Sequence, residues 1–109
     1  MKKCTRNKML NMIEQLEKIL IILENEILDK NSIWEKGVLL EIVKPEMEEL
    51  YSHFKIGEKF FKYGKRQRML VSTYIITDSL KPLTNTNLGK EILKLQKIYK
   101  KFKKDLYSA

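Results

Sequence analysis

Apolar residues recur at alternating spacings of four and three residues through almost the whole of this 109-residue chain. This spacing places side chains on one face of an α-helix, whereas a half-buried strand alternates at every second residue. The pattern therefore predicts a long first helix over residues 9–27, and its width predicts contact with two neighbouring helices. The first row comprises Met9, Ile13, Leu16, Leu20, Leu23 and Ile27, widened by Met12, Ile19 and Ile22.

A second helix is predicted to begin at Ser32, because the segment SIWE has the spacing of a capping box. In that motif the Ser32 hydroxyl and the Glu35 carboxylate each bind a free backbone N–H. Pro45 predicts a kink or a break, since the residue before a proline avoids the helical conformation. The helical spacing continues beyond the proline, so we expect a kinked or restarted helix that reaches about Phe61.

The segment MLVSTYIIT, residues 69–77, contains β-branched residues of high strand propensity. We interpret it as a helix, because no second strand candidate could satisfy its backbone groups. A linker over 79–87 precedes a last helix that is capped by Thr86 or Asn87. Its apolar row comprises Leu88, Ile92, Leu95, Tyr99, Phe102 and Leu106.

These segments predict an all-α fold, a compact antiparallel bundle of four to five helices with a long first helix and a basic amphipathic C-terminal helix. A chain of this length forms one domain, and we expect it to cover residues 1–109, with 1–8 and 107–109 prone to fraying. The predicted core includes Leu20, Leu23, Leu50, Leu95 and Tyr99.

The composition predicts a cytoplasmic protein. Cys4 is the single cysteine, so no internal disulfide is possible. The N-terminal segment MKKCTRNKML lacks the apolar stretch of a signal peptide, and the longest apolar run, residues 19–23, is far too short to span a membrane.

Charge is segregated along the chain, whose formal net charge is +8. Residues 9–50 carry ten acidic and four basic residues, whereas residues 51–109 carry fourteen basic and four acidic residues. Such segregation predicts a basic surface that attracts an acidic macromolecule. The alternative is that the acidic and basic parts neutralise one another across helix contacts in the folded protein.

Two groups of basic residues are the candidate partner-binding sites. Lysines in the last helix lie about 200° round the helix from its apolar row, on the side opposite the predicted core. Phe61 in the segment FFKYGKRQRML, residues 60–70, is expected to face the core while its basic neighbours point to water. The candidate residues are Lys59, Lys62, Lys65, Arg66 and Arg68 in the first group, and Lys90, Lys94, Lys97, Lys101 and Lys104 in the last helix.

These rows predict a binding or regulatory protein whose basic second half contacts an acidic macromolecule. An acidic protein surface is the favoured partner, because the sequence contains no recognition signature for bases. The alternatives are a nucleic acid, whose phosphates the lysines could neutralise, and an anionic membrane surface. The sequence also leaves open whether the chain forms a homo-oligomer. In size and charge the chain is similar to bacteriocin immunity proteins and to phage and plasmid regulators, although no motif is shared.

Catalytic chemistry is not predicted. His53 is the single histidine and lies four residues after Glu49, a spacing typical of an ordinary surface contact on a helix. Glu46, Glu49 and His53 could cluster, but they lack the Glu-x-x-His spacing of di-iron bundles. No phosphate-binding loop or activated nucleophile is present. We therefore expect no enzymatic activity, no cofactor, no metal and no small-molecule substrate.

Overall fold

The structure is a computed structural model that describes the backbone of residues 2–56 and 70–107; among these, the side chains of 2–9, 53, 56 and 102–107 are not described. The described chain is helical, and no strand occurs in it. It contains α1 (Lys2–Leu28), α2 (Lys36–Val38), the π-helical η1 (Leu39–Val43), α3 (Lys44–Ile56), α4 (Val71–Asp78), the 3-10 turn η3 (Leu83–Asn85) and α5 (Asn87–Tyr107). Because α2, η1 and α3 follow one another without interruption, the described residues form four helices, which confirms the predicted all-α class.

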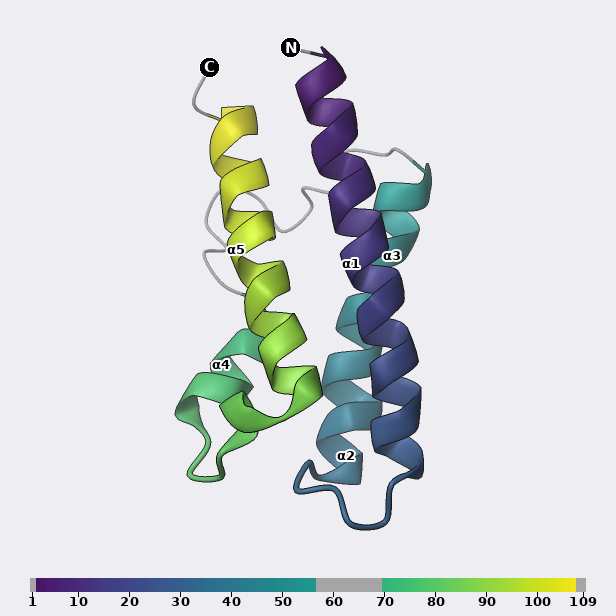
Figure 1. Ribbon diagram of the computed structural model, residues 1–109, viewed down its shortest axis with the longest axis vertical. Helices are drawn as coiled ribbons and strands as arrows, with labels where there is room; N and C mark the ends of the chain where they lie inside the picture. The colour runs from purple at the N-terminus through teal and green to yellow at the C-terminus, as the bar shows by residue number, and fades with distance from the viewer. Residues whose placement is uncertain (1, 57–69, 108–109) are drawn as a thin grey trace.

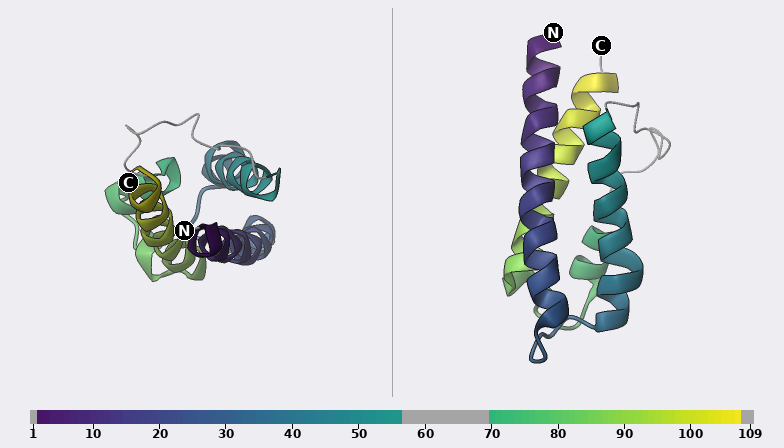
Figure 2. Two further views of the ribbon diagram at one scale, coloured as in Figure 1. Left: turned by 90° about the horizontal axis from the view of Figure 1, so that it is seen from above. Right: turned by 90° about the vertical axis from the view of Figure 1, so that its right-hand side faces the viewer.

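The long helices lie side by side along the 45 Å axis of the molecule (Figure 1). α1 packs against α5 on one side and against α3 on the other, and it runs antiparallel to both (Figures 1 and 2). The prediction that the first helix contacts two neighbours is therefore confirmed. α4 packs against α5, η1 and η3 at the end of the bundle that lies opposite the two chain termini.

One continuous core joins all four helices. Of the residues predicted to be in it, Leu23, Leu50, Leu95 and Tyr99 are buried, whereas Leu20 is only partly buried. The side chains in the core that are fully enclosed come from every helix, and the largest are Tyr99, Phe54, Met12, Leu16, Ile19, Leu23, Leu39, Met47, Leu50, Leu70, Ile76 and Leu88.

The buried face of α1 is displaced by part of a turn from the predicted row. Its fully buried residues are Met12, Leu16, Ile19 and Leu23, while Leu20 lies towards the edge. Because α1 contacts two helices at once, its most buried residues are those that point between α3 and α5. This arrangement explains the width of the apolar face in the sequence.

The predicted capping box at Ser32 is wrong. The helix begins at Lys36, and Glu35 is its N-cap residue without a side-chain hydrogen bond. The Ser32 hydroxyl instead accepts a hydrogen bond from the Trp34 backbone N–H at 3.1 Å and donates one to the Glu26 carboxylate. Ser32 therefore stabilises the turn that follows α1, where a local hydrogen bond competes successfully with helix capping.

The helix continues through Pro45, as predicted from the apolar spacing, and of the two predicted alternatives, a kink or a break, the break does not occur. Lys44, the residue before the proline, keeps the helical conformation (φ −60°, ψ −50°). Its N–H reaches back five residues to the Leu39 carbonyl, so the irregularity predicted at the proline takes the form of a π-helical turn. α3 then continues to Ile56, and the predicted extension to Phe61 lies outside the described residues.

The helix predicted over residues 69–77 is confirmed from Val71 onwards as α4, while Leu70 is its extended N-cap residue and Met69 lies outside the described residues. Side chains from two other helices hold the N-terminus of α4. The Glu46 carboxylate of α3 accepts hydrogen bonds from the backbone N–H groups of Val71 at 2.7 Å and Ser72 at 2.9 Å. The Gln96 amide oxygen of α5 accepts from the Leu70 backbone N–H at 2.8 Å and from the Thr73 hydroxyl at 3.1 Å. These acceptors satisfy donors that a helix N-terminus leaves without internal partners.

Thr86 caps α5, which confirms one of the two predicted alternatives, Thr86 and Asn87. Its hydroxyl accepts hydrogen bonds from the Gly89 N–H at 2.9 Å and from the Trp34 indole N–H at 3.1 Å. The same hydroxyl donates to the Leu83 carbonyl at 2.6 Å. All three hydrogen-bonding positions of the hydroxyl are thus used, and the start of α5 is tied to both η3 and the turn before α2.

Replacement of Gly89 by alanine should destabilise the protein. A Cβ atom at residue 89 would lie 1.9 Å from the Leu83 carbonyl oxygen, so the backbone of η3 or α5 would have to move. We expect a loss of about 1–3 kcal/mol in the free energy of unfolding, measured by denaturant titration. Gly37→Ala is the control, because nothing lies within 4 Å of its Cβ position, and this substitution should be neutral or stabilising.

Replacement of Glu46 by alanine should also destabilise the protein, because it leaves the N–H groups of Val71 and Ser72 without their acceptor. We expect a loss of about 1–3 kcal/mol in the free energy of unfolding. Glu48→Ala removes an exposed glutamate from the same helix and should change stability by less than about 0.5 kcal/mol. Equal effects of the two substitutions would contradict the assigned role of Glu46.

Candidate functional site: the lysine row of α5

The structure places one of the two predicted basic groups. Lys90, Lys94, Lys97 and Lys101 are exposed on α5. The backbone of Lys104 lies in the same helix, but its side chain is outside the described part of the molecule. The other predicted residues, Lys59, Lys62, Lys65, Arg66 and Arg68, belong to residues 57–69, which the structure does not describe, and the same holds for Phe61.

The orientation of the lysines follows from the packing of α5. Leu88, Ile92, Leu95 and Tyr99 are 0–1% exposed and fix one face of the helix against the core. The four exposed lysines recur at the same spacing, about half a turn out of phase with that row. We call Lys90, Lys94, Lys97 and Lys101 the lysine row. It forms a straight line of positive charge along the outer face of α5.

Glu91 is the acidic residue nearest the lysine row. Its carboxylate lies 3.3 Å from the Lys18 amine of α1 and 3.8 Å from the Lys94 amine. The buried Gln15 amide donates to the Glu91 carboxylate at 3.0 Å and to the Glu91 carbonyl at 2.9 Å. The hydrogen bond from Gln15, with the neighbouring charges of Lys18 and Lys94, holds the pKa of Glu91 below its ordinary value although burial opposes this shift.

The acidic residues of the first half do not neutralise the lysine row. Glu24 of α1 pairs with Lys44 at 3.3 Å, and Glu17 accepts a hydrogen bond from the Tyr51 hydroxyl at 2.9 Å. Both contacts join α1 to the helix formed by α2, η1 and α3. Within the described residues, no carboxylate forms an ion pair with Lys90, Lys97 or Lys101. Three members of the lysine row are therefore available to a partner.

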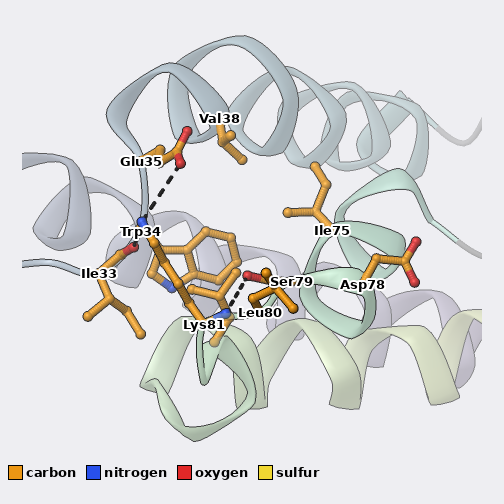
Figure 3. Close-up of a pocket in the computed structure, with 10 residues that line it drawn as sticks. Ile33, Trp34, Glu35, Val38, Ile75, Asp78, Ser79, Leu80 and Lys81 are labelled. Atoms are coloured by element: carbon orange, nitrogen blue, oxygen red, sulfur yellow. Dashed lines mark hydrogen bonds and ion pairs between the residues drawn. The ribbon is translucent and has the colours of Figure 1, made fainter.

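A pocket of about 380 Å³ lies between α2 and α4, at the end of the molecule opposite the two chain termini. Val38 and Ile75 lie on one side of the pocket, and Trp34 and Leu80 lie below both in the view of Figure 3. Lys81 closes one side, where its amine lies 3.7 Å from the Glu35 carboxylate. The remaining lining residues are Ile33, Asp78, Ser79 and Leu83. This pocket could not be predicted from the sequence, because its walls come from segments some forty residues apart.

The sequence allowed Glu46, Glu49 and His53 to cluster, but the structure gives Glu46 another role. Glu46 is buried and binds the N-terminus of α4, and the side chain of His53 lies outside the described residues. Among the described side chains, no group of three potential metal ligands lies together. Glu46 is thus a structural residue whose role depends on a contact across the bundle.

No described helix has the length and apolar character that crossing a membrane would require. Neither protein-family models, nor curated proteins, nor solved structures provide a match to this chain.

Glu91 should make the stability of the protein sensitive to acid. Because its pKa is lower in the folded state, its stabilising contribution is present above the ordinary value of 4.5 and disappears as the pH falls through the folded value. Thermal unfolding should show that Glu91→Gln lowers the melting temperature at pH 7, and that the difference from the wild type shrinks in acid. The exposed Glu48 provides the control substitution Glu48→Gln. A difference that is constant with pH would contradict the assigned contacts.

Proposed function

We propose that this protein is a non-enzymatic binding or regulatory protein whose lysine row contacts an acidic macromolecule, with an acidic protein surface as the favoured partner. The observation that supports the proposal is the line of exposed lysines on α5. Three of them, Lys90, Lys97 and Lys101, form no ion pair with a described carboxylate. Like charges at these helical spacings repel one another. A partner that carries negative charge would relieve this repulsion.

An acidic protein surface is preferred over nucleic acid because the described part of α5 offers charge without chemistry for reading bases. Its one aromatic side chain within the described set, Tyr99, is buried, so stacking on unpaired bases would have no platform there. Complementary charge between two proteins speeds their association more than it strengthens the final complex. A regulatory role of the kind found in immunity proteins or phage regulators is compatible with this mode of binding.

Nucleic acid is the second candidate, supported by the same lysines. Each exposed lysine could neutralise one phosphate, and affinity would then fall steeply as salt is added. An anionic membrane surface is a third candidate with less support. The apolar face of α5 is covered by the core, so the helix could offer a membrane only its charged face.

Reversal of charge in the lysine row should weaken partner binding. Immobilised protein carrying Lys97→Glu and Lys101→Glu should retain less acidic protein from a host lysate than the wild type does, most clearly at low ionic strength. A fluorescent DNA duplex and a single strand, titrated in parallel, measure the nucleic-acid alternative directly. Lys30→Glu changes an exposed lysine at the turn after α1 and should leave binding unchanged.

The circular dichroism spectrum should stay helical in all variants, because exposed charges contribute little to stability. Capture that is equal for the wild type and the Lys97→Glu, Lys101→Glu variant would contradict the proposal. Tight binding of DNA that depends on these lysines, without capture of acidic protein, would move the function to nucleic-acid binding.

A further inference from the structure

The pocket between α2 and α4 has the size and the lining of a site for a small molecule. Its volume of about 380 Å³ lies within the range of such sites, roughly 300–1,000 Å³. Sites of this kind combine a mainly apolar lining with a few polar groups that orient the ligand. Six of the ten lining residues are apolar: Ile33, Trp34, Val38, Ile75, Leu80 and Leu83.

Two of these apolar residues leave much of their surface in water. Leu80 is fully exposed, and Ile33 is 38% exposed. Trp34, by contrast, is buried, and its indole N–H already donates to the Thr86 hydroxyl. Because the indole has no other hydrogen-bonding group, Trp34 offers the pocket only apolar ring surface. A bound molecule with an apolar body would therefore remove apolar surface from water on both sides, which is favourable.

The charged groups of the lining present no unpaired charge to the pocket. The Lys81 amine lies 3.7 Å from the Glu35 carboxylate and also donates to the Ile33 carbonyl at 3.4 Å (Figure 3). The Asp78 carboxylate points away from the other lining residues (Figure 3). An ion that entered the pocket would lose water without gaining an unpaired opposite charge. The lining therefore favours a neutral molecule.

The Ser79 hydroxyl is the polar group of the lining that can orient a ligand. It accepts a hydrogen bond from the Lys81 backbone N–H at 3.1 Å (Figure 3). Among the described residues, it donates to no acceptor. A hydroxyl carries one donor hydrogen, so this hydrogen is available to a carbonyl, ether or hydroxyl oxygen of a bound molecule.

We propose that this pocket binds a small neutral molecule with an apolar body and one hydrogen-bond acceptor. The apolar body would lie against Val38, Ile75 and Trp34, and the acceptor would bind the Ser79 hydroxyl. No described basic group accepts the Ser79 hydrogen, so the molecule is bound rather than converted. The inference goes beyond the proposed function, because none of the lining residues belongs to the lysine row.

Benzene derivatives of similar size and different charge test this ligand class. Acetophenone is neutral and carries a carbonyl acceptor, whereas benzoate is negative and benzylammonium is positive. Trp34 is the single tryptophan, so its indole N–H gives one resonance in a nitrogen–proton correlation NMR spectrum of the full chain. Acetophenone should shift this resonance in a saturable way, and both ions should bind at least about tenfold more weakly.

Replacement of Ser79 by alanine separates the hydrogen bond from the burial of apolar surface. It should weaken binding of acetophenone about threefold to tenfold, the ratio expected for one lost hydrogen bond. It should leave the affinity for ethylbenzene, which lacks the acceptor, unchanged. Ser79→Thr retains the hydroxyl and should bind acetophenone as the wild type does. Ser52→Ala removes an exposed hydroxyl from α3 and is the control.

Replacement of Ile75 by phenylalanine fills part of the pocket and should weaken binding of acetophenone at least about tenfold. Val71→Phe adds the same ring to α4 at an exposed position that does not line the pocket, so binding should be unchanged. Circular dichroism should confirm that both variants are folded.

Three results would overturn the inference: no saturable shift with acetophenone, tighter binding of either ion than of acetophenone, or equal effects of Ile75→Phe and Val71→Phe. Acetophenone binding that is the same in Ser79→Ala and the wild type would overturn the role of the hydroxyl and with it the requirement for an acceptor.

Discussion

Two buried hydrogen-bond acceptors, the carboxylate of Glu46 and the amide oxygen of Gln96, determine where α4 lies. At eight residues, α4 is too short to be stable as an isolated helix. The acceptors come from different long helices and bind consecutive parts of its N-terminus. The stability of α4 therefore depends on α3 and α5, which supply these acceptors, and its Ile76 is part of the common core.

The regular parts of the fold could be predicted from the sequence because they depend on local periodicity. The long helices α1 and α5 follow from the spacing of apolar residues, and the helical nature of residues 71–78 follows from the lack of a second strand candidate in the sequence. The N-cap at Ser32 could not be predicted correctly, because the motif does not show that the hydroxyl binds Glu26 and the Trp34 N–H instead. The helix through Pro45 depends on a π-helical turn, which no apolar spacing records.

The direction of the lysine row could likewise be predicted from the sequence, whereas the contacts around it could not. The outward direction of Lys90, Lys94, Lys97 and Lys101 follows from the buried row on the same helix. Whether acidic residues would cover these lysines could not be read from the charge pattern, since it requires knowing that Glu24 faces Lys44. The role of Glu46 depends likewise on α4, whose first residue is 25 positions away. Contacts of this kind depend on tertiary structure, and so does the pocket between α2 and α4.

The contact between Trp34 and Thr86 gives the molecule an internal optical probe. Trp34 is the single tryptophan of the chain, it is 3% exposed, and its indole N–H is bound to the hydroxyl that caps α5. Tryptophan emission from the folded protein should consequently arise from one sheltered fluorophore at the junction of α2, η3 and α5. A shift of that emission to longer wavelength would report separation of this junction, so that its opening can be distinguished from unfolding of the long helices followed by circular dichroism.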